Sequence, residues 1–183
     1  MAVLKRTVIV LLLCLVSFPA RADGTLQLAE QEIKAGLLYN FLKYTEWPVT
    51  ENPASITVCV FGDDPFGEYL QPMAERTVNQ RVIIIRKLNT NKDASNCQLV
   101  FINAGEKDRW PDLQRVLNGK AVLTVSDMAG FTASGGMIAF GRKDSHIRME
   151  MSRRAVAAGG LQVEERLLKL VTVADGPGGE ARP

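Results

Sequence analysis

The residues whose types suggest chemistry gather in two loops, each of which follows a short apolar run. The first loop, residues 61–67, carries the adjacent carboxylates Asp63 and Asp64, with Phe66 close behind them. Paired carboxylates can hold a divalent cation or act as an acid pair, but a metal site usually needs more oxygen ligands than two neighbours whose side chains diverge. The alternative, which we favour, is a turn in which an aspartate caps a helix that begins at Pro65.

The second loop covers residues 126–136 and begins with Ser126 and Asp127. Its glycines leave the backbone open enough for amides to cradle an anion, although a G-x-G-x-x-G motif is absent. Ser126 would need a base to act as a nucleophile, and the sequence has one histidine, His146, which we expect to be a surface or packing residue. Since G-x-S-x-G is absent too, we expect this loop to present Phe131 to a partner or ligand.

Aromatic residues form a third candidate group, around the end of the first predicted helix. They are Tyr39, Phe41, Tyr44 and Trp47. We expect most of this group to lie in the core. Any exposed part is a candidate partner surface, because aromatic side chains often anchor interfaces.

An alternation of helical and apolar β-type patterns provides the elements that must position these loops. Helices are predicted over 26–44, 65–76, 108–117, 152–158 and 163–173, and strands over 56–61, 81–88, 99–102, 121–125, 137–140 and 146–151. This order is typical of an α/β fold with a mainly parallel sheet covered by helices on both faces. The close spacing of the last two strands predicts an antiparallel edge hairpin. Ligands in such sheets bind beyond the carboxyl ends of strands, where both loops could lie.

The first 22 residues have the pattern of a secretory signal peptide. Lys5 and Arg6 precede an apolar run over 7–18, and Ala20-Arg21-Ala22 supplies small residues for cleavage after Ala22. The run is shorter than the about 20 apolar residues that span a bilayer, although an uncleaved anchor is the alternative. We therefore expect the protein in the periplasm.

Cleavage changes the charge balance of the chain. Loss of Lys5, Arg6 and Arg21 reduces 22 Lys and Arg to 19, against 20 Asp and Glu. The sequence offers no basic stripe for nucleic acid, so we expect no such partner. We expect residues 23–174 to form a single α/β domain. The Gly- and Pro-rich tail over 175–183 is expected to be disordered.

Two cysteines, Cys59 and Cys97, remain after removal of the signal. In an oxidising compartment they permit one intramolecular disulfide, which would stabilise the fold by roughly 4 kcal/mol in a chain-entropy estimate. Two buried free thiols are the alternative. With one histidine in the chain and both cysteines better used in a bridge, we expect no metal site and no cofactor.

Several segments, taken in order, resemble the YfiR family of periplasmic regulators. The resemblance covers nearly all of residues 26–173. Its motifs are the helix and Trp-Pro of 34–48, the strand and turn of 58–67, the strands of 97–102 and 122–127, Gly130-Phe131, the Gly-Gly-Met-Ile of 135–138 and the ending over 161–170.

The resemblance implies a regulator without enzymatic activity. It implies that the protein binds and represses the periplasmic sensor part of an inner-membrane diguanylate cyclase, and so controls cyclic-di-GMP signalling and biofilm formation. It further implies an OmpA-like outer-membrane lipoprotein as a second partner, a homodimer, and a disulfide between Cys59 and Cys97. The second cysteine pair of the best-known member has no counterpart here, because residues 140–151 contain no cysteine.

Two other functions stay open on the residues alone. One is a receptor that binds a small ligand in a crevice between the 62–67 and 126–136 loops. The other is a hydrolase that uses Ser126 with His146.

Overall fold

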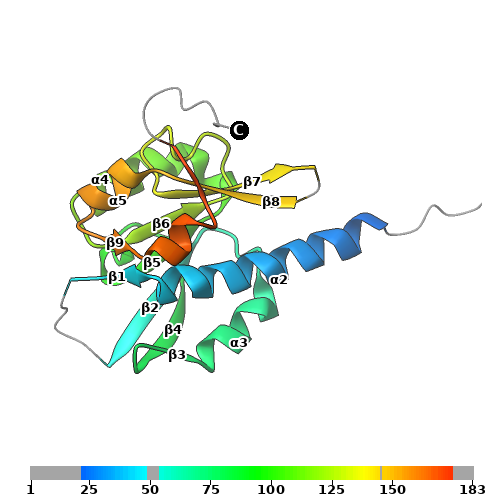
Figure 1. Ribbon diagram of the computed structural model, residues 1–183, viewed down its shortest axis with the longest axis horizontal. Coiled ribbons are helices and arrows are strands. Elements are labelled where there is room, and N and C mark those ends of the chain that lie inside the picture. Colours follow the sequence, from blue (N-terminus) through cyan, green and yellow to red (C-terminus); the bar gives the residue numbers. More distant parts are fainter. Residues whose placement is uncertain (1–21, 49–53, 145, 175–183) are drawn as a thin grey trace, which may run out of the picture.

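The computed structural model describes residues 22–48, 54–144 and 146–174, and an eight-stranded sheet runs through its centre (Figure 1). Residues 1–21, which hold nearly all of the predicted signal peptide, and the predicted tail over 175–183 lie outside these ranges. No helix in the described residues is long and apolar enough to span a membrane.

The sheet has the strand order β10-β8-β7-β6-β5-β2-β4-β3. From β4 to β7 every neighbouring pair is parallel, whereas β7 and β8 form an antiparallel hairpin near one edge. The predicted α/β fold with its mainly parallel sheet and antiparallel hairpin is confirmed. The strands are β2 (Ser55–Phe61), β3 (Thr77–Val78), β4 (Arg81–Leu88), β5 (Leu99–Ile102), β6 (Leu123–Ser126), β7 (Ile138–Lys143), β8 (His146–Met151) and β10 (Thr172–Val173).

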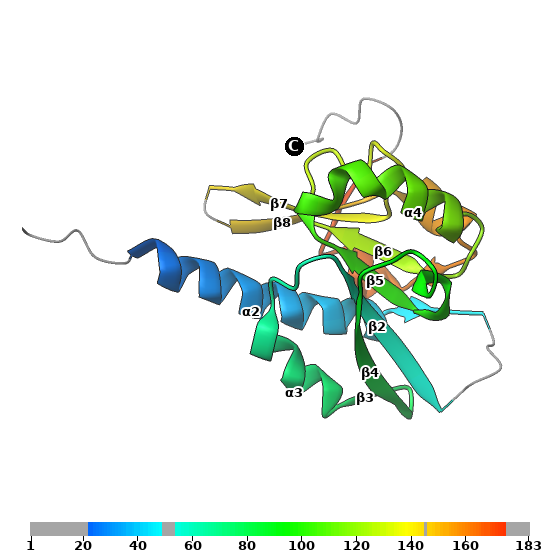
Figure 2. The same ribbon diagram turned by 180° about the vertical axis from the view of Figure 1, so that it is seen from behind.

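Helices cover both faces of the sheet, with α2 on one face and α4 on the other, as the two opposite views show (Figures 1 and 2). The long α2 (Ala22–Lys43) buries Leu38, Phe41 and Leu42 against one face. The other helical segments are η2 (Gly67–Leu70), α3 (Gln71–Ala74), η3 (Ala94–Asn96), η4 (Ala104–Arg109), α4 (Trp110–Leu117), α5 (Arg153–Ala158) and α6 (Glu165–Leu168).

Strand β2 shows why the sheet needs helices on both faces. Its side chains alternate between two separate core clusters, with Val58 and Val60 on the α2 side and Cys59 and Phe61 on the α4 side. A strand in the middle of a parallel sheet is buried on both faces and therefore reads as a continuous apolar run. Burial from Ile56 to Phe61 matches this expectation.

Two predicted helices differ from the structure. In place of the helix expected over 65–76 the structure has the 3-10 segment η2 and the short α3, which together cover 67–74. The φ of 52° at Gly67 lies in the left-handed region, so a regular helix cannot run through from Pro65. The helix expected over 163–173 shrinks to α6. Before it, β9 (Gln162–Val163) pairs with β1 (Thr45–Glu46), and after it β10 pairs with β8, so strand pairing fixes both ends of the segment.

The predicted disulfide joins Cys59 in β2 to Cys97, which lies two residues before the neighbouring strand β5. The two Cα atoms are 6.1 Å apart, and both residues are buried in the core cluster on the α4 side. The bridge thus connects two central strands across a sequence separation of 38.

Replacing Cys59 and Cys97 together by alanine should lower the free energy of unfolding by about 2 to 4 kcal/mol, because the unfolded chain regains the freedom of the closed loop. Urea unfolding without reductant, followed by tryptophan fluorescence, measures the difference. Reductant should move the urea midpoint of the unmodified protein toward that of the double variant, and should leave the midpoint of the variant unchanged. Equal midpoints for the oxidised protein and the variant would contradict the prediction.

Candidate functional site

The carboxyl ends of β2, β5 and β6 lie side by side, because these strands are neighbours and run parallel. From β2 the chain crosses to β4 on one side and later returns to β5 on the other side. Such a point of reversal is where open α/β sheets usually bind their ligands. We call the loops at this place, residues 62–65, 103–106 and 126–128, the carboxyl edge.

The loop after β5 joins the two loops that the sequence singled out. The Nδ2 of Asn103 donates to the carbonyl of Asp63 at 2.9 Å, and the Oδ1 of Asp127 accepts from the amide of Ala104 at 3.1 Å. The sequence reasoning placed 61–67 and 126–136 in one region but missed Asn103. The sequence did contain a signal for it, because Asn103 is a polar residue directly after the fully apolar strand β5.

The carboxylate of Asp64 organises the turn after β2. Its Oδ1 accepts from the amides of Phe66 and Gly67 at 2.8 and 3.3 Å, and both Asp63 and Asp64 are exposed. Among the described residues no group of three or more His, Cys, Asp or Glu side chains could hold a metal ion. The contacts of Asp64 form the favoured turn, but the helical segment after it begins at Gly67 and not at Pro65, and its N-cap residue Phe66 makes no side-chain cap.

Two aromatic residues expected to line loops for a ligand or partner, Phe66 and Phe131, are instead buried. Phe66 packs edge-to-face on Phe101 with ring centroids 4.7 Å apart, and Phe131 lies 4.6 Å from the ring of Trp110. Both phenylalanine rings are nearly inaccessible to solvent. The expectation that the second loop presents Phe131 to a partner is therefore wrong, because helix α4 already covers the ring.

Ser126 and His146 do not form a catalytic pair. The Oγ of Ser126 donates to the carbonyl of Ile102 at 2.7 Å and accepts from the amide of Met128 at 3.0 Å, in a fully buried position. His146 lies exposed near the tip of the hairpin. It pairs with Lys143, four residues beyond the position level with Ser126, which is about 13 Å along the strand. The hydrolase hypothesis has no support in this arrangement.

The aromatic group at the end of α2 is mainly structural. Phe41 is buried, and Tyr39, Tyr44 and Trp47 are half-buried against the core on the α2 side. The Nε1 of Trp47 donates to the carbonyl of Gln98 at 3.1 Å, which ties the segment after α2 to the residue before β5. These contacts agree with the expectation that most of the group belongs to the core.

A network of four charged side chains ties α2 to the carboxyl edge and to the hairpin. Lys34 is 5 % exposed, and its Nζ lies 2.8 Å from an oxygen of Glu30 and 3.5 Å from Asp127. The second oxygen of Glu30 pairs with Arg142 of β7 at 3.1 Å. The network fixes the part of α2 that lies along the hairpin (Figures 1 and 2).

Lys34 also lies 5.7 Å from the centroid of the Phe140 ring. A buried lysine is stabilised only when carboxylates and aromatic faces replace the water that it loses. Sequence reasoning missed Lys34, because a lysine in an amphipathic helix ordinarily lies on the solvated face. The described polar groups of the carboxyl edge are bonded mainly to one another, which favours a rigid scaffold over a catalytic centre.

Replacing Lys34 by methionine should reduce the free energy of unfolding by about 1 to 3 kcal/mol, because the partly buried Glu30 and Asp127 lose their shared cation. Arg115→Met is the matched control, since Arg115 pairs with Asp112 at an exposed position. That control should change stability by no more than about 0.5 kcal/mol. Urea unfolding of both variants measures the difference. Equal losses in the free energy of unfolding would show that the buried network contributes no more to stability than the exposed pair.

Among solved structures, the chain is similar to a conserved domain protein from Vibrio cholerae O1 biovar El Tor strain N16961, with 9 % identity and a TM-score of 0.48. That match covers 78 % of this chain, which spans 59 % of the length of the other chain. The family model described as YfiR/HmsC-like matches residues 31–172. The chain therefore belongs to the YfiR/HmsC-like family, whose members are periplasmic regulatory proteins and not catalysts.

Proposed function

We propose that this protein binds the periplasmic sensor part of an inner-membrane diguanylate cyclase and represses the cyclase. The observation that carries the proposal is the family match over residues 31–172, which supports a periplasmic regulator of the YfiR kind. A repressor of this kind must bind the inactive sensor more tightly than the active one, since only differential affinity shifts the equilibrium between the two states.

One face of α2 is the best candidate for the contact with the sensor. Ala29, Ile33, Gly36 and Asn40 follow one another at spacings of four, three and four residues, so they lie along one side of the helix. Ala29, Ile33 and Gly36 are exposed and Asn40 is half-buried. We call these four residues the open α2 face.

Gly36 distinguishes this face from an ordinary solvated surface. A Cβ added there would meet nothing within 4 Å, so no packing inside the described structure requires a glycine. A glycine inside a helix costs about 1 kcal/mol relative to alanine. A partner whose backbone approaches α2 closely would account for it, because a larger side chain would hold that partner away.

The exposed apolar side chain of Ile33 points to the same face. Ile33 is 55 % exposed beside Gly36, in the part of the helix that Lys34 and Glu30 fix to the rest of the fold. A rigid helix that presents an isoleucine next to a glycine suits contact with a second helix. The charged network would favour binding, because it holds the open α2 face in one conformation before the partner binds and so reduces the entropy lost on binding.

Two further interactions belong to the proposal because the family resemblance implies them. An OmpA-like outer-membrane lipoprotein would release the cyclase by sequestering this protein, and the protein would act as a homodimer. Both can be tested with the variants described below, by sedimentation of the protein alone and by binding to the purified lipoprotein.

Ile33→Gln and Gly36→Gln should each weaken binding to the purified periplasmic domain of the cyclase by tenfold or more. Interferometry with the immobilised domain measures the dissociation constant. Leu28→Gln is the matched control, since Leu28 is 54 % exposed on the same helix but lies about 140° around it from Ile33. Gly36→Gln also improves helix propensity, so a loss of binding cannot reflect a loss of folding.

The same variants should raise cyclic-di-GMP in cells, measured with a transcriptional reporter, while Leu28→Gln should leave it unchanged. Equal binding by all three variants would remove the open α2 face from the proposal. No binding of the unmodified protein to the sensor domain would refute the proposed function itself.

A further inference from the structure

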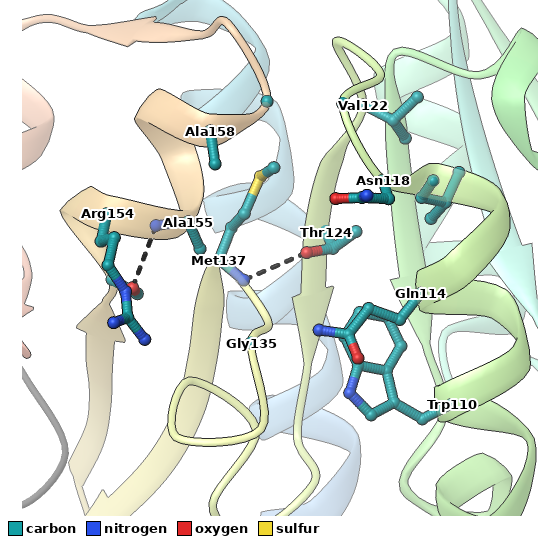
Figure 3. A pocket seen from close by; sticks show the side chains of 14 residues that line it. Trp110, Gln114, Asn118, Val122, Thr124, Gly135, Met137, Arg154, Ala155 and Ala158 are labelled. Atoms are coloured by element: carbon teal, nitrogen blue, oxygen red, sulfur yellow. Dashed lines mark hydrogen bonds between the residues drawn. The ribbon is translucent and has the colours of Figure 1, made fainter.

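A pocket of about 310 Å³ lies between α4 and α5, over the sheet face that α4 covers (Figure 3). Trp110 and Gln114 of α4 form one wall, Ala155 and Ala158 of α5 form the opposite wall, and Met137 lies between them. The lining includes no residue of the 62–67 loop, so this is not the crevice expected from the sequence. It lies toward the amino ends of β6 and β7, away from the carboxyl edge.

The buried part of the lining is mainly apolar, with the hydroxyl groups of Thr124 and Ser152 among the apolar side chains. Leu117, Val122 and Met137 are buried at its base, and Thr124 is 3 % exposed among them. The Oγ1 of Thr124 accepts from the amide of Met137 at 3.1 Å. A threonine hydroxyl can accept and donate at once, so this contact leaves its proton available to an acceptor in the pocket.

The rim of the pocket is basic. Arg154 is the one charged side chain in the described lining, which contains no carboxylate. No ion pair joins Arg154 to another residue in the part of the chain that the structure describes. Figure 3 shows Arg154 on the α5 side of the opening, across from the Gln114 amide on α4.

These features select a chemical class of ligand. A cation at the rim without a neighbouring carboxylate favours an anion, and guanidinium pairs especially well with carboxylate. The apolar base favours a hydrocarbon body, and the volume is at the lower end of the about 300 to 1,000 Å³ of small-molecule sites. We propose that the pocket binds a small monocarboxylic acid with an apolar body, whose carboxylate pairs with Arg154. This inference does not depend on the proposed cyclase partner.

The test uses phenylacetate, 4-phenylbutyrate and octanoate as probes, each with the uncharged amide of the same skeleton. The protein is labelled with ¹³C at methionine methyl groups, and the Met137 signal is assigned by Met137→Leu. At least one acid should shift the Met137 methyl signal in a saturable way, whereas its amide should bind at least tenfold more weakly. Because Met137 lies in the pocket, this readout locates the binding.

Two variants and one control complete the experiment. Arg154→Gln should weaken binding of the acid about tenfold and leave binding of the amide unchanged. Ala158→Leu should abolish the shift by filling the exposed mouth of the pocket. Arg153→Gln removes the neighbouring exposed cation, which does not line the pocket, and should have no effect.

Several results would overturn the proposal. They are no shift of the Met137 methyl signal with any acid at millimolar concentration, equal affinity for acid and amide, and equal effects of Arg154→Gln and Arg153→Gln. Circular dichroism of each variant confirms that the fold is kept. A failed cyclase pull-down would leave this result untouched, so the two proposals fail separately.

Discussion

The buried ammonium group of Lys34 is the interaction on which the placement of α2 against the sheet depends. It lies between Glu30 and Asp127, and Glu30 in turn pairs with Arg142 of the hairpin. An ionised lysine is costly to bury unless carboxylates surround it. Because of that cost, the contact fixes the position of α2. Lys34 reaches Asp127 only when α2 has one position along its axis and one rotation about it, relative to the sheet. The same constraint determines which side of α2 faces outward, and so which residues a partner can reach.

The sequence predicted the sheet well because the physics of its strands is local. The run over Ser55–Phe61 is apolar at almost every position, as a strand covered on both faces requires, and the eight residues of β4 were predicted without error. The prediction failed where pairing between distant segments overrides the local pattern. Residues 163–173 have helical periodicity, yet the amide of Glu164 donates to the carbonyl of Tyr44, and the segment becomes a short helix between two strands.

The candidate site was predictable in place but not in detail. The loops after β2 and β6 lie at the same edge of the sheet because both strands are parallel members of it. The alternation of helices and strands in the sequence predicted such a parallel sheet. Burial of Phe131 depends on α4 and could not be seen in a loop rich in glycine, and the pairing of Lys34 with Asp127 joins residues 93 positions apart. Polar groups at this edge bond to one another, while the pocket lies toward the opposite end of the sheet. The fold therefore separates a rigid edge, an outward helix face and a small cavity.

The most direct test of the proposed contact between α2 and the sensor is methyl NMR of isoleucine side chains during titration with the periplasmic domain of the cyclase. Ile33 and Ile84 are both exposed, but Ile33 lies on α2 and Ile84 lies on β4. If α2 contacts the sensor, the Ile33 methyl signal shifts or broadens in proportion to complex formed while that of Ile84 stays in place. A titration in which complex forms and Ile33 does not respond, or in which both signals respond equally, would contradict the assignment of the open α2 face.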